Sequence, residues 1–227
     1  MTAKDMFSHR VSILTGHYGT GKTEVSVNLA LALAAEGEQV MLADLDIVNP
    51  YFRSRERRPL LEKAGVRVIS SSQACSDADV PALPAELLTI LENREIRGIL
   101  DIGGDPVGAR VLARFQPKII AEDYQLIFVL NANRPEVRDA ESAAAYLRSI
   151  EAVTGLTCSG LVNNTHLCGE TTPAEIRKGA ALAQEVSRQT GIPILCHTAE
   201  RRFLESLSDL GEPVFPIAIN MKKPWER

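Results

Sequence analysis

The chain has 227 residues, of which 45% are hydrophobic and 24% are charged, and its formal net charge is −4. A chain of this size can bury one substantial core, so we expect a single domain over residues 1–227. The slightly acidic balance does not indicate a nucleic-acid surface, and no apolar stretch has the length that a membrane span needs.

The cysteines and the N-terminus indicate the compartment. The sequence begins without the apolar run of a signal peptide, and it contains no C-x-x-C pair among its cysteines, Cys75, Cys158, Cys168 and Cys196. Cys158 and Cys196 lie in apolar, strand-like runs, where a reduced core thiol is expected. We therefore expect a cytoplasmic protein with no zinc or iron–sulfur site held within one chain.

Strand-like and helix-like segments alternate along the whole chain. Strands are predicted at 10–15, 39–43, 66–70, 98–102, 125–130, 159–162 and 193–196, with a further edge strand at 214–219. Helices are predicted at 22–36, 85–93, 107–115, 135–154, 173–190 and 200–210. The strands are apolar along their whole length, which indicates burial on both faces of a parallel sheet. We predict a doubly wound, mostly parallel α/β sheet with helices on both faces and ligands at the carboxyl ends of its strands.

Prolines and glycines predict where the helices begin and end. Pro135 and Pro173 are expected at helix starts, where a proline is tolerated. Gly155, Gly191 and Gly211 are expected just after helix ends. Residues 70–84 form the longest predicted loop.

Residues 16–23 read GHYGTGKT and match the phosphate-binding loop (P-loop) pattern G-x-x-x-x-G-K-[ST] in full. A strand precedes the match and a helix without Pro or Gly follows it, so backbone N–H groups and a helix N-terminus meet at one point. A turn that merely ends a strand is the alternative. Lys22 should reach the β- and γ-phosphates, and Thr23 should offer its hydroxyl to Mg²⁺. All eight residues are predicted nucleotide contacts, namely Gly16, His17, Tyr18, Gly19, Thr20, Gly21, Lys22 and Thr23.

Acidic residues follow two other predicted strands. Asp44 and Asp46 end the second strand, and Asp101 ends the fourth, just before a Gly-Gly turn, as a Walker B aspartate would. Carboxylates at neighbouring strand ends are the groups that hold Mg²⁺ and its waters beside a phosphate loop. Solvated loop acids or helix caps are the alternative for each of them.

These segments resemble those of the MinD/ParA-like P-loop ATPases, a group that also contains the nitrogenase iron protein and the CobQ/CobB-type domains. The likeness runs over most of the chain: VMLADLDIVNP (40–50) is similar to switch I, DIGGDP (101–106) to the start of switch II, and VLNANRPEVRDAESAAAYL (129–147) to the segment after the central strand. The resemblance implies that Asp46 orients the attacking water and that Asp44 and Asp101 serve Mg²⁺ and its water shell. It also implies that Asn164, at the end of GLVNN, reads the adenine base.

The P-loop departs from this family at two positions. His17 stands where the family has the lysine that crosses a dimer interface to the partner's nucleotide, and Tyr18 stands where it has glycine. A neutral imidazole does not replace an ammonium on an anionic oxygen, although a protonated one does so in part. His17 is therefore either a solvent-facing loop residue or a phosphate contact, and a nucleotide-dependent homodimer stays open.

Three further features bear on the ligand and on partners. The N-K-x-D signature of guanine-binding relatives is replaced by Asn163–His166 (NNTH), which favours ATP over GTP. A basic cluster of Arg53, Arg55, Arg57 and Arg58 is either a solvated face or a partner contact that responds to the γ-phosphate. The tail from 221 to 227 is too short, and too interrupted by Pro224, to form a membrane-binding helix.

The sequence thus predicts a Mg²⁺-dependent ATPase of the MinD/ParA-like type that acts as a nucleotide-gated switch on an unidentified client. One alternative is an ATP-dependent ligase of the dethiobiotin synthetase or CobB type, which transfers the γ-phosphate to a carboxylate substrate. Another is a module that binds ATP and recruits a partner with negligible turnover.

Overall fold

The structure of the chain is a computed structural model that describes residues 1–46, 57–70 and 85–221. Several predictions from the sequence lie outside these residues. They are the end of the segment similar to switch I (47–50), Arg53 and Arg55 of the basic cluster, Cys75 within the loop 71–84, and the tail from 222 to 227.

In the described residues, eight strands form one sheet in the order β3-β2-β4-β1-β5-β6-β7-β8, and all neighbouring strands in it are parallel. Their bounds are β1 (Val11–Thr15), β2 (Gln39–Leu45), β3 (Arg67–Ser70), β4 (Ile96–Ile102), β5 (Tyr124–Leu130), β6 (Cys158–Asn163), β7 (Ile194–Glu200) and β8 (Val214–Ile217). The strand order reverses around β1, so the carboxyl end of β1 lies at a switch point of the sheet, where ligands bind in such folds. The predicted parallel sheet and its edge strand are confirmed.

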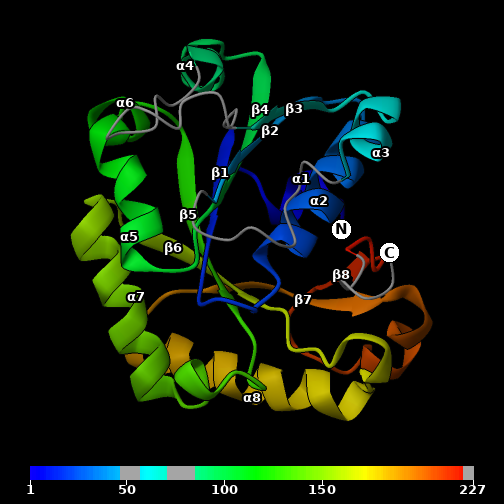
Figure 1. Ribbon diagram of the computed structural model, residues 1–227. Coiled ribbons are helices and arrows are strands. Elements are labelled where there is room, and N and C mark those ends of the chain that lie inside the picture. The colour runs from blue at the N-terminus through cyan, green and yellow to red at the C-terminus, as the bar shows by residue number, and fades with distance from the viewer. Residues whose placement is uncertain (47–56, 71–84, 222–227) are drawn as a thin grey trace.

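Helices cover both faces of this sheet (Figure 1). α1 (Ala3–Met6), α2 (Lys22–Ala35) and α3 (Arg58–Lys63) pack on one face through one apolar cluster. The other face carries α4 (Ala85–Glu92), α5 (Pro106–Ala109), α6 (Gln116–Ile120), α7 (Ala140–Thr154) and α8 (Pro173–Thr190), which share a second cluster. The doubly wound architecture is therefore confirmed. No helix in the described parts is long and apolar enough to cross a membrane.

Three predicted helices differ from the structure. The segment 107–115 divides into α5 and a 3₁₀ turn over Arg110–Phe115. Pro135 opens a 3₁₀ turn, whereas α7 begins later, where the Asp139 side chain accepts a hydrogen bond from the Ser142 backbone N–H at 2.8 Å. The segment 200–210 is no α-helix, so Gly211 follows none.

Residues 201–203 and 205–207 instead form two 3₁₀ turns. Leu204, Leu207 and Leu210 recur every third residue and pack in one small cluster, and this spacing suits three residues per turn. The other predicted helix ends are confirmed: Gly155 and Gly191 close α7 and α8 with φ of 69° and 76°.

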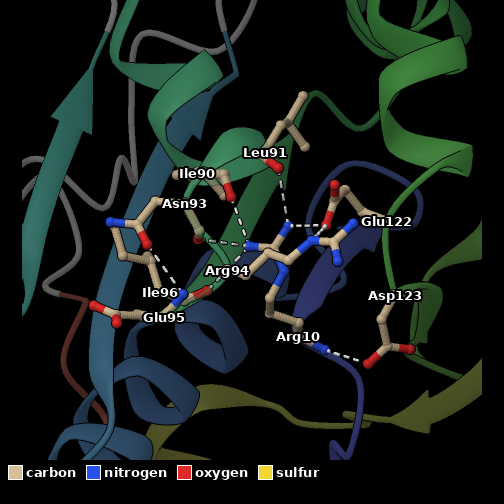
Figure 2. Close-up of polar contacts among 9 residues, drawn as sticks. All are labelled: Arg10, Ile90, Leu91, Asn93, Arg94, Glu95, Ile96, Glu122 and Asp123. Atoms are coloured by element: carbon tan, nitrogen blue, oxygen red, sulfur yellow. Dashed lines mark hydrogen bonds and ion pairs between the residues drawn. The ribbon is translucent and has the colours of Figure 1, made fainter.

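The amino ends of the strands are held together by Arg10 (Figure 2). Its guanidinium donates hydrogen bonds of 2.6 to 3.2 Å to four carbonyl oxygens around the end of α4 and the start of β4, those of Ile90, Leu91, Asn93 and Ile96. It also pairs with Glu122 at 2.8 Å, and only 11% of its side chain is exposed. Arg10 thus supplies donors for carbonyl groups that α4 leaves unpaired at its end.

We expect Arg10→Met to lower the free energy of unfolding by about 2–4 kcal/mol, because buried carbonyl groups and Glu122 would lose their partner. Urea denaturation measures this change. Arg94→Met is the matched control, since Arg94 is 80% exposed and lies 3.9 Å from the same Glu122 carboxylate, and it should change stability by less than about 0.5 kcal/mol. Equal effects of the two variants would contradict the role of Arg10.

Candidate functional site

The P-loop connects β1 to α2 at the switch point of the sheet. Gly16, Gly19 and Gly21 have positive φ values of 143°, 77° and 84°, which side chains rarely adopt. The backbone N–H and hydroxyl of Thr20 donate to the carbonyl oxygen of His17 at 3.2 and 2.9 Å. The glycines therefore allow a tight loop that ends at the N-terminus of α2, as a polyphosphate site requires.

Lys22, the first residue of α2, carries a buried charge, since only 6% of the residue is exposed. Burial lowers the pKa of Lys22, and the carboxylates of Asp101, Asp46 and Asp105 oppose that shift. Asp44 and Asp101 lie opposite one another in the register of β2 and β4, and they are 3% and 1% exposed. The structure thus brings Lys22 together with all three acids predicted for the site, and it adds Asp105.

Asp101 is the acid of this group whose pKa is shifted most clearly. Burial raises its pKa to about 7, Asp44 and Asp46 add to the rise, and Lys22 and the Thr23 hydroxyl oppose it. Neither carboxylate oxygen of Asp101 has a hydrogen-bond partner of normal geometry. An acid that is buried and unsatisfied in this way favours a proton or a cation beside it.

This arrangement fits Mg²⁺ bound together with a nucleotide. In the described residues no group of three or more His, Cys, Asp or Glu side chains could hold a metal ion. Mg²⁺ does not need one, because it usually takes one or two carboxylates, several waters and phosphate oxygens. The orphaned oxygens of Asp101, its neighbour Asp44 and the Thr23 hydroxyl are donors of the kind that Mg²⁺ prefers.

The Gly103–Gly104 turn after β4 lies directly on the P-loop. A Cβ atom at Gly104 would come within 2.8 Å of the Lys22 Nζ and 2.9 Å of the Tyr18 backbone N, so only glycine fits there. The Tyr146 hydroxyl, from α7, donates to the carbonyl oxygen of Gly104. Burial raises the pKa of Tyr146 to about 12, which keeps it a donor. Sequence reasoning missed Tyr146, which lies 42 residues from its partner.

His17 contacts the same tyrosine. Its ring meets the Tyr146 ring edge-on, with centroids 5.1 Å apart, and 23% of its side chain is exposed. Its Nδ1 lies 3.2 Å from the Tyr18 carbonyl oxygen and 3.8 Å from a Glu136 carboxylate oxygen. His17 is therefore packed within its own chain, and a contact with phosphate stays a prediction. Tyr18 is 53% exposed.

Asn164 lies behind the P-loop, where it is 1% exposed. Its Nδ2 donates to the Thr20 carbonyl oxygen at 2.8 Å, and its Oδ1 accepts from the Thr198 hydroxyl at 2.5 Å. The side chain predicted to read the base thus also holds the P-loop in place. Its contact with adenine stays a prediction.

Two more side chains reach the P-loop without having been singled out from the sequence. Arg134 Nε donates to the Gly19 carbonyl oxygen at 2.7 Å, and His166 Nε2 is buried without a partner. Arg134 follows β5 and His166 follows β6, the two strands next to β1 on that side of the sheet. Side chains that follow such strands gather at one edge of the sheet, so their positions in the sequence could have indicated that they lie at the site.

The sequence is similar to those of known P-loop NTPases. A family model described as ParA, NUBPL iron-transfer P-loop NTPase, matches residues 6–54. The cytosolic Fe-S cluster assembly factor cfd1 of Emericella nidulans is 36% identical over 42% of this chain and 26% of its own length. The septum site-determining protein MinD of Helicobacter pylori is 24% identical over 96% of this chain and 87% of its own length.

Solved structures show the same fold. The cell division protein FtsY of Thermotoga maritima aligns with a TM-score of 0.55 at 24% identity, over 81% of this chain and 59% of that one. The signal recognition particle 54 kDa protein of Aeropyrum pernix, in complex with GDP, gives a TM-score of 0.53 at 24% identity, over 82% and 40%. This chain spans less than two thirds of these two proteins and of cfd1, and most of MinD.

We expect Asp101→Asn to stabilise the nucleotide-free protein, and more so at pH 8 than at pH 5. A carboxyl whose pKa is raised from 3.8 to about 7 on folding loses stability as the pH rises through that window. The gain at pH 8 should reach up to about 4 kcal/mol, the value of a shift of about three pKa units. Urea denaturation at the two pH values measures it, and an equal change at both would contradict the burial of a strained carboxylate.

Proposed function

Because the chain is a P-loop NTPase of the MinD/ParA-like type, we propose that it is a Mg²⁺-dependent ATPase that acts as a nucleotide-gated switch. The observation that carries this proposal is the buried group of Lys22 and its acids beneath the P-loop. A positive charge and several carboxylates are needed together where a triphosphate and a divalent cation bind and react. A turn that only ended a strand would not bury them.

The roles proposed for these residues follow from their charge. Lys22 binds the β- and γ-phosphate oxygens, and the P-loop N–H groups surround them. Thr23, Asp44 and Asp101 would hold Mg²⁺, which neutralises part of the phosphate charge when bound. Asp46 accepts a hydrogen bond from the attacking water and orients it. The water oxygen bonds to the γ-phosphorus as the bond to the bridging oxygen breaks, which releases ADP and phosphate.

The switch is proposed to lie in the Gly103–Gly104 turn. Because even a Cβ atom added to Gly104 would collide with Lys22 Nζ and the Tyr18 backbone N, a γ-phosphate bound to Lys22 would compete for the same space. Segments placed in this way change position between the triphosphate and diphosphate states. The client that reads the change is unidentified, and a nucleotide-dependent homodimer is one form that the signal can take.

ATP is proposed as the nucleotide, because the N-K-x-D signature for guanine is absent and Asn164 stands at that strand end. Iron–sulfur clusters belong to the names of several relatives, such as the iron-sulfur cluster carrier protein of Escherichia coli, which is 50% identical over 18% of this chain and 11% of its own length. Cys158, Cys168 and Cys196 are free in the structure, and cluster transfer is no part of this proposal.

We expect Lys22→Ala to weaken ATP binding by at least about 100-fold, because charge-assisted hydrogen bonds to phosphate would be lost. Isothermal titration with Mg²⁺ present measures the affinity, and circular dichroism verifies that the variant is folded. Lys63→Ala, at an exposed lysine of α3, is the control and should bind ATP as wild type does. Near-normal affinity in Lys22→Ala would overturn the proposed function.

We expect purified protein to release phosphate from ATP with Mg²⁺ alone, whereas a ligase would need a carboxylate substrate. Asp46→Ala should bind Mg²⁺·ATP within about threefold of wild type and lose at least about 100-fold in hydrolysis, since orienting water affects only turnover. Asp44→Ala should instead weaken Mg²⁺-dependent binding. The reverse pattern would exchange the roles of the two acids. Negligible phosphate release by wild type, left unchanged by either substitution, would favour a module without turnover.

A further inference from the structure

Two side chains border the P-loop on the side away from the acids. Arg134 follows β5 and His166 follows β6, and both approach glycines of the loop. Neither residue contributes to the proposed phosphate or metal chemistry. His166 and Asn164 both approach Gly21. The Nδ2 and Oδ1 atoms of Asn164 each already bond to protein, so recognition of a nucleotide base at this point needs further partners.

The Arg134 guanidinium lies flat against Gly19. A Cβ atom placed on Gly19 would be 2.7, 2.8 and 2.9 Å from the Cζ, Nε and Nη2 atoms of Arg134. If this Cβ approached the guanidinium in its plane, between Nε and Nη2, it would be clearly closer to the two nitrogens than to Cζ. The three distances are instead nearly equal, so Gly19 faces the flat side of the guanidinium. The hydrogen bond from Nε to the Gly19 carbonyl oxygen fixes this orientation. A planar, weakly hydrated cation of this kind stacks readily on an aromatic ring.

His166 presents an unpaired donor at the same place. Its Nδ1 accepts a hydrogen bond of 3.3 Å from the Cys168 backbone N–H, so the neutral ring carries its proton on Nε2. That Nε2 is buried without a partner, and a Cβ atom on Gly21 would lie 3.1 Å from it. A buried donor without an acceptor is unfavourable, and a ligand that supplies the acceptor relieves the cost.

The charge state of His166 narrows the class of acceptor. Burial lowers its pKa to about 4, and the positive charge of Arg134 adds to the shift, so the ring is neutral at physiological pH. A neutral donor beside a planar cation suits a heteroaromatic base better than it suits a phosphate, which would favour a protonated ring.

We propose that Arg134 and His166 form the base side of the nucleotide site, where the purine stacks on the Arg134 guanidinium and accepts a hydrogen bond from His166 Nε2–H. This inference rests on the proposed function, because it names the residues that recognise the base of the same nucleotide. It assigns specificity to two side chains that hold no phosphate and no metal.

Tripolyphosphate, which lacks the nucleoside, separates base recognition from phosphate binding. Titrations with ATP and with tripolyphosphate, each with Mg²⁺, are compared for wild type and His166→Phe, which keeps a ring and removes the donor. ATP should bind about tenfold more weakly to the variant, the effect of one hydrogen bond, and tripolyphosphate should change by less than about twofold. Equal weakening of both ligands, or unchanged ATP affinity, would overturn the role of His166.

Arg134→Lys tests the stacking surface, because lysine keeps the charge and a donor but has no plane. We expect ATP affinity to fall about three- to tenfold, the range of a stacking contact on one base, with tripolyphosphate again within about twofold. Arg138→Lys, at an exposed arginine of the same segment, should leave both ligands unchanged. Equal affinity of Arg134→Lys and wild type for ATP would overturn the stacking role.

Failure of the inference can be told from failure of the proposed function. If wild type binds neither ATP nor tripolyphosphate, the proposed function fails and this inference fails with it. Suppose that wild type binds ATP no more tightly than tripolyphosphate and that Lys22→Ala abolishes the binding of both ligands. The proposed phosphate site would then be supported, and base recognition by Arg134 and His166 would be wrong.

Discussion

The site depends on one buried positive charge, the ammonium of Lys22. Removing such a charge from water is unfavourable unless opposite charges accompany it, and three carboxylates do so here. The carboxylates in turn rely on Lys22, since Asp101 and Asp44 face one another on adjacent strands and repel. The acids together thus offset the burial of Lys22, and Lys22 offsets part of their mutual repulsion. The parallel sheet makes this possible, because β2, β4 and β1 all deliver their last residues to the same edge.

The two edges of the sheet carry different sets of buried polar groups. At the amino ends, the terminal nitrogens of Arg10 are fully used in hydrogen bonds to the backbone and to Glu122, while its Nε is buried without a partner. At the carboxyl ends, Asp101 and His166 keep buried polar atoms without partners. Native proteins leave few such groups, and those that border the P-loop indicate where a ligand is expected. Stability and recognition are thus located at opposite edges of one sheet.

The sequence predicted those parts of the structure that depend on neighbouring residues. Continuous apolar runs located all the strands, and the glycine spacing and Lys22 located the P-loop, because both patterns act over a few residues. The helix predicted over 200–210 was wrong. The segment is rich in residues that favour an α-helix, but its leucines recur every third residue and pack in that spacing with Ile176 and Ala199. Contacts between distant residues could not be read from the sequence, such as the bond that joins Arg134 to Gly19 across 115 positions.

Tyr146 gives α7 a direct part in the state of the nucleotide site. Its ring packs against His17 and its hydroxyl donates to the Gly104 carbonyl oxygen, so the P-loop and the Gly103–Gly104 turn contact the same side chain. A displacement of Gly104 that moved Tyr146 would also disturb the contact between the Tyr146 and His17 rings. Coupling free energies are reciprocal: if a ligand on α7 shifted Tyr146 and so changed the affinity for nucleotide, nucleotide would change the affinity for that ligand by the same factor.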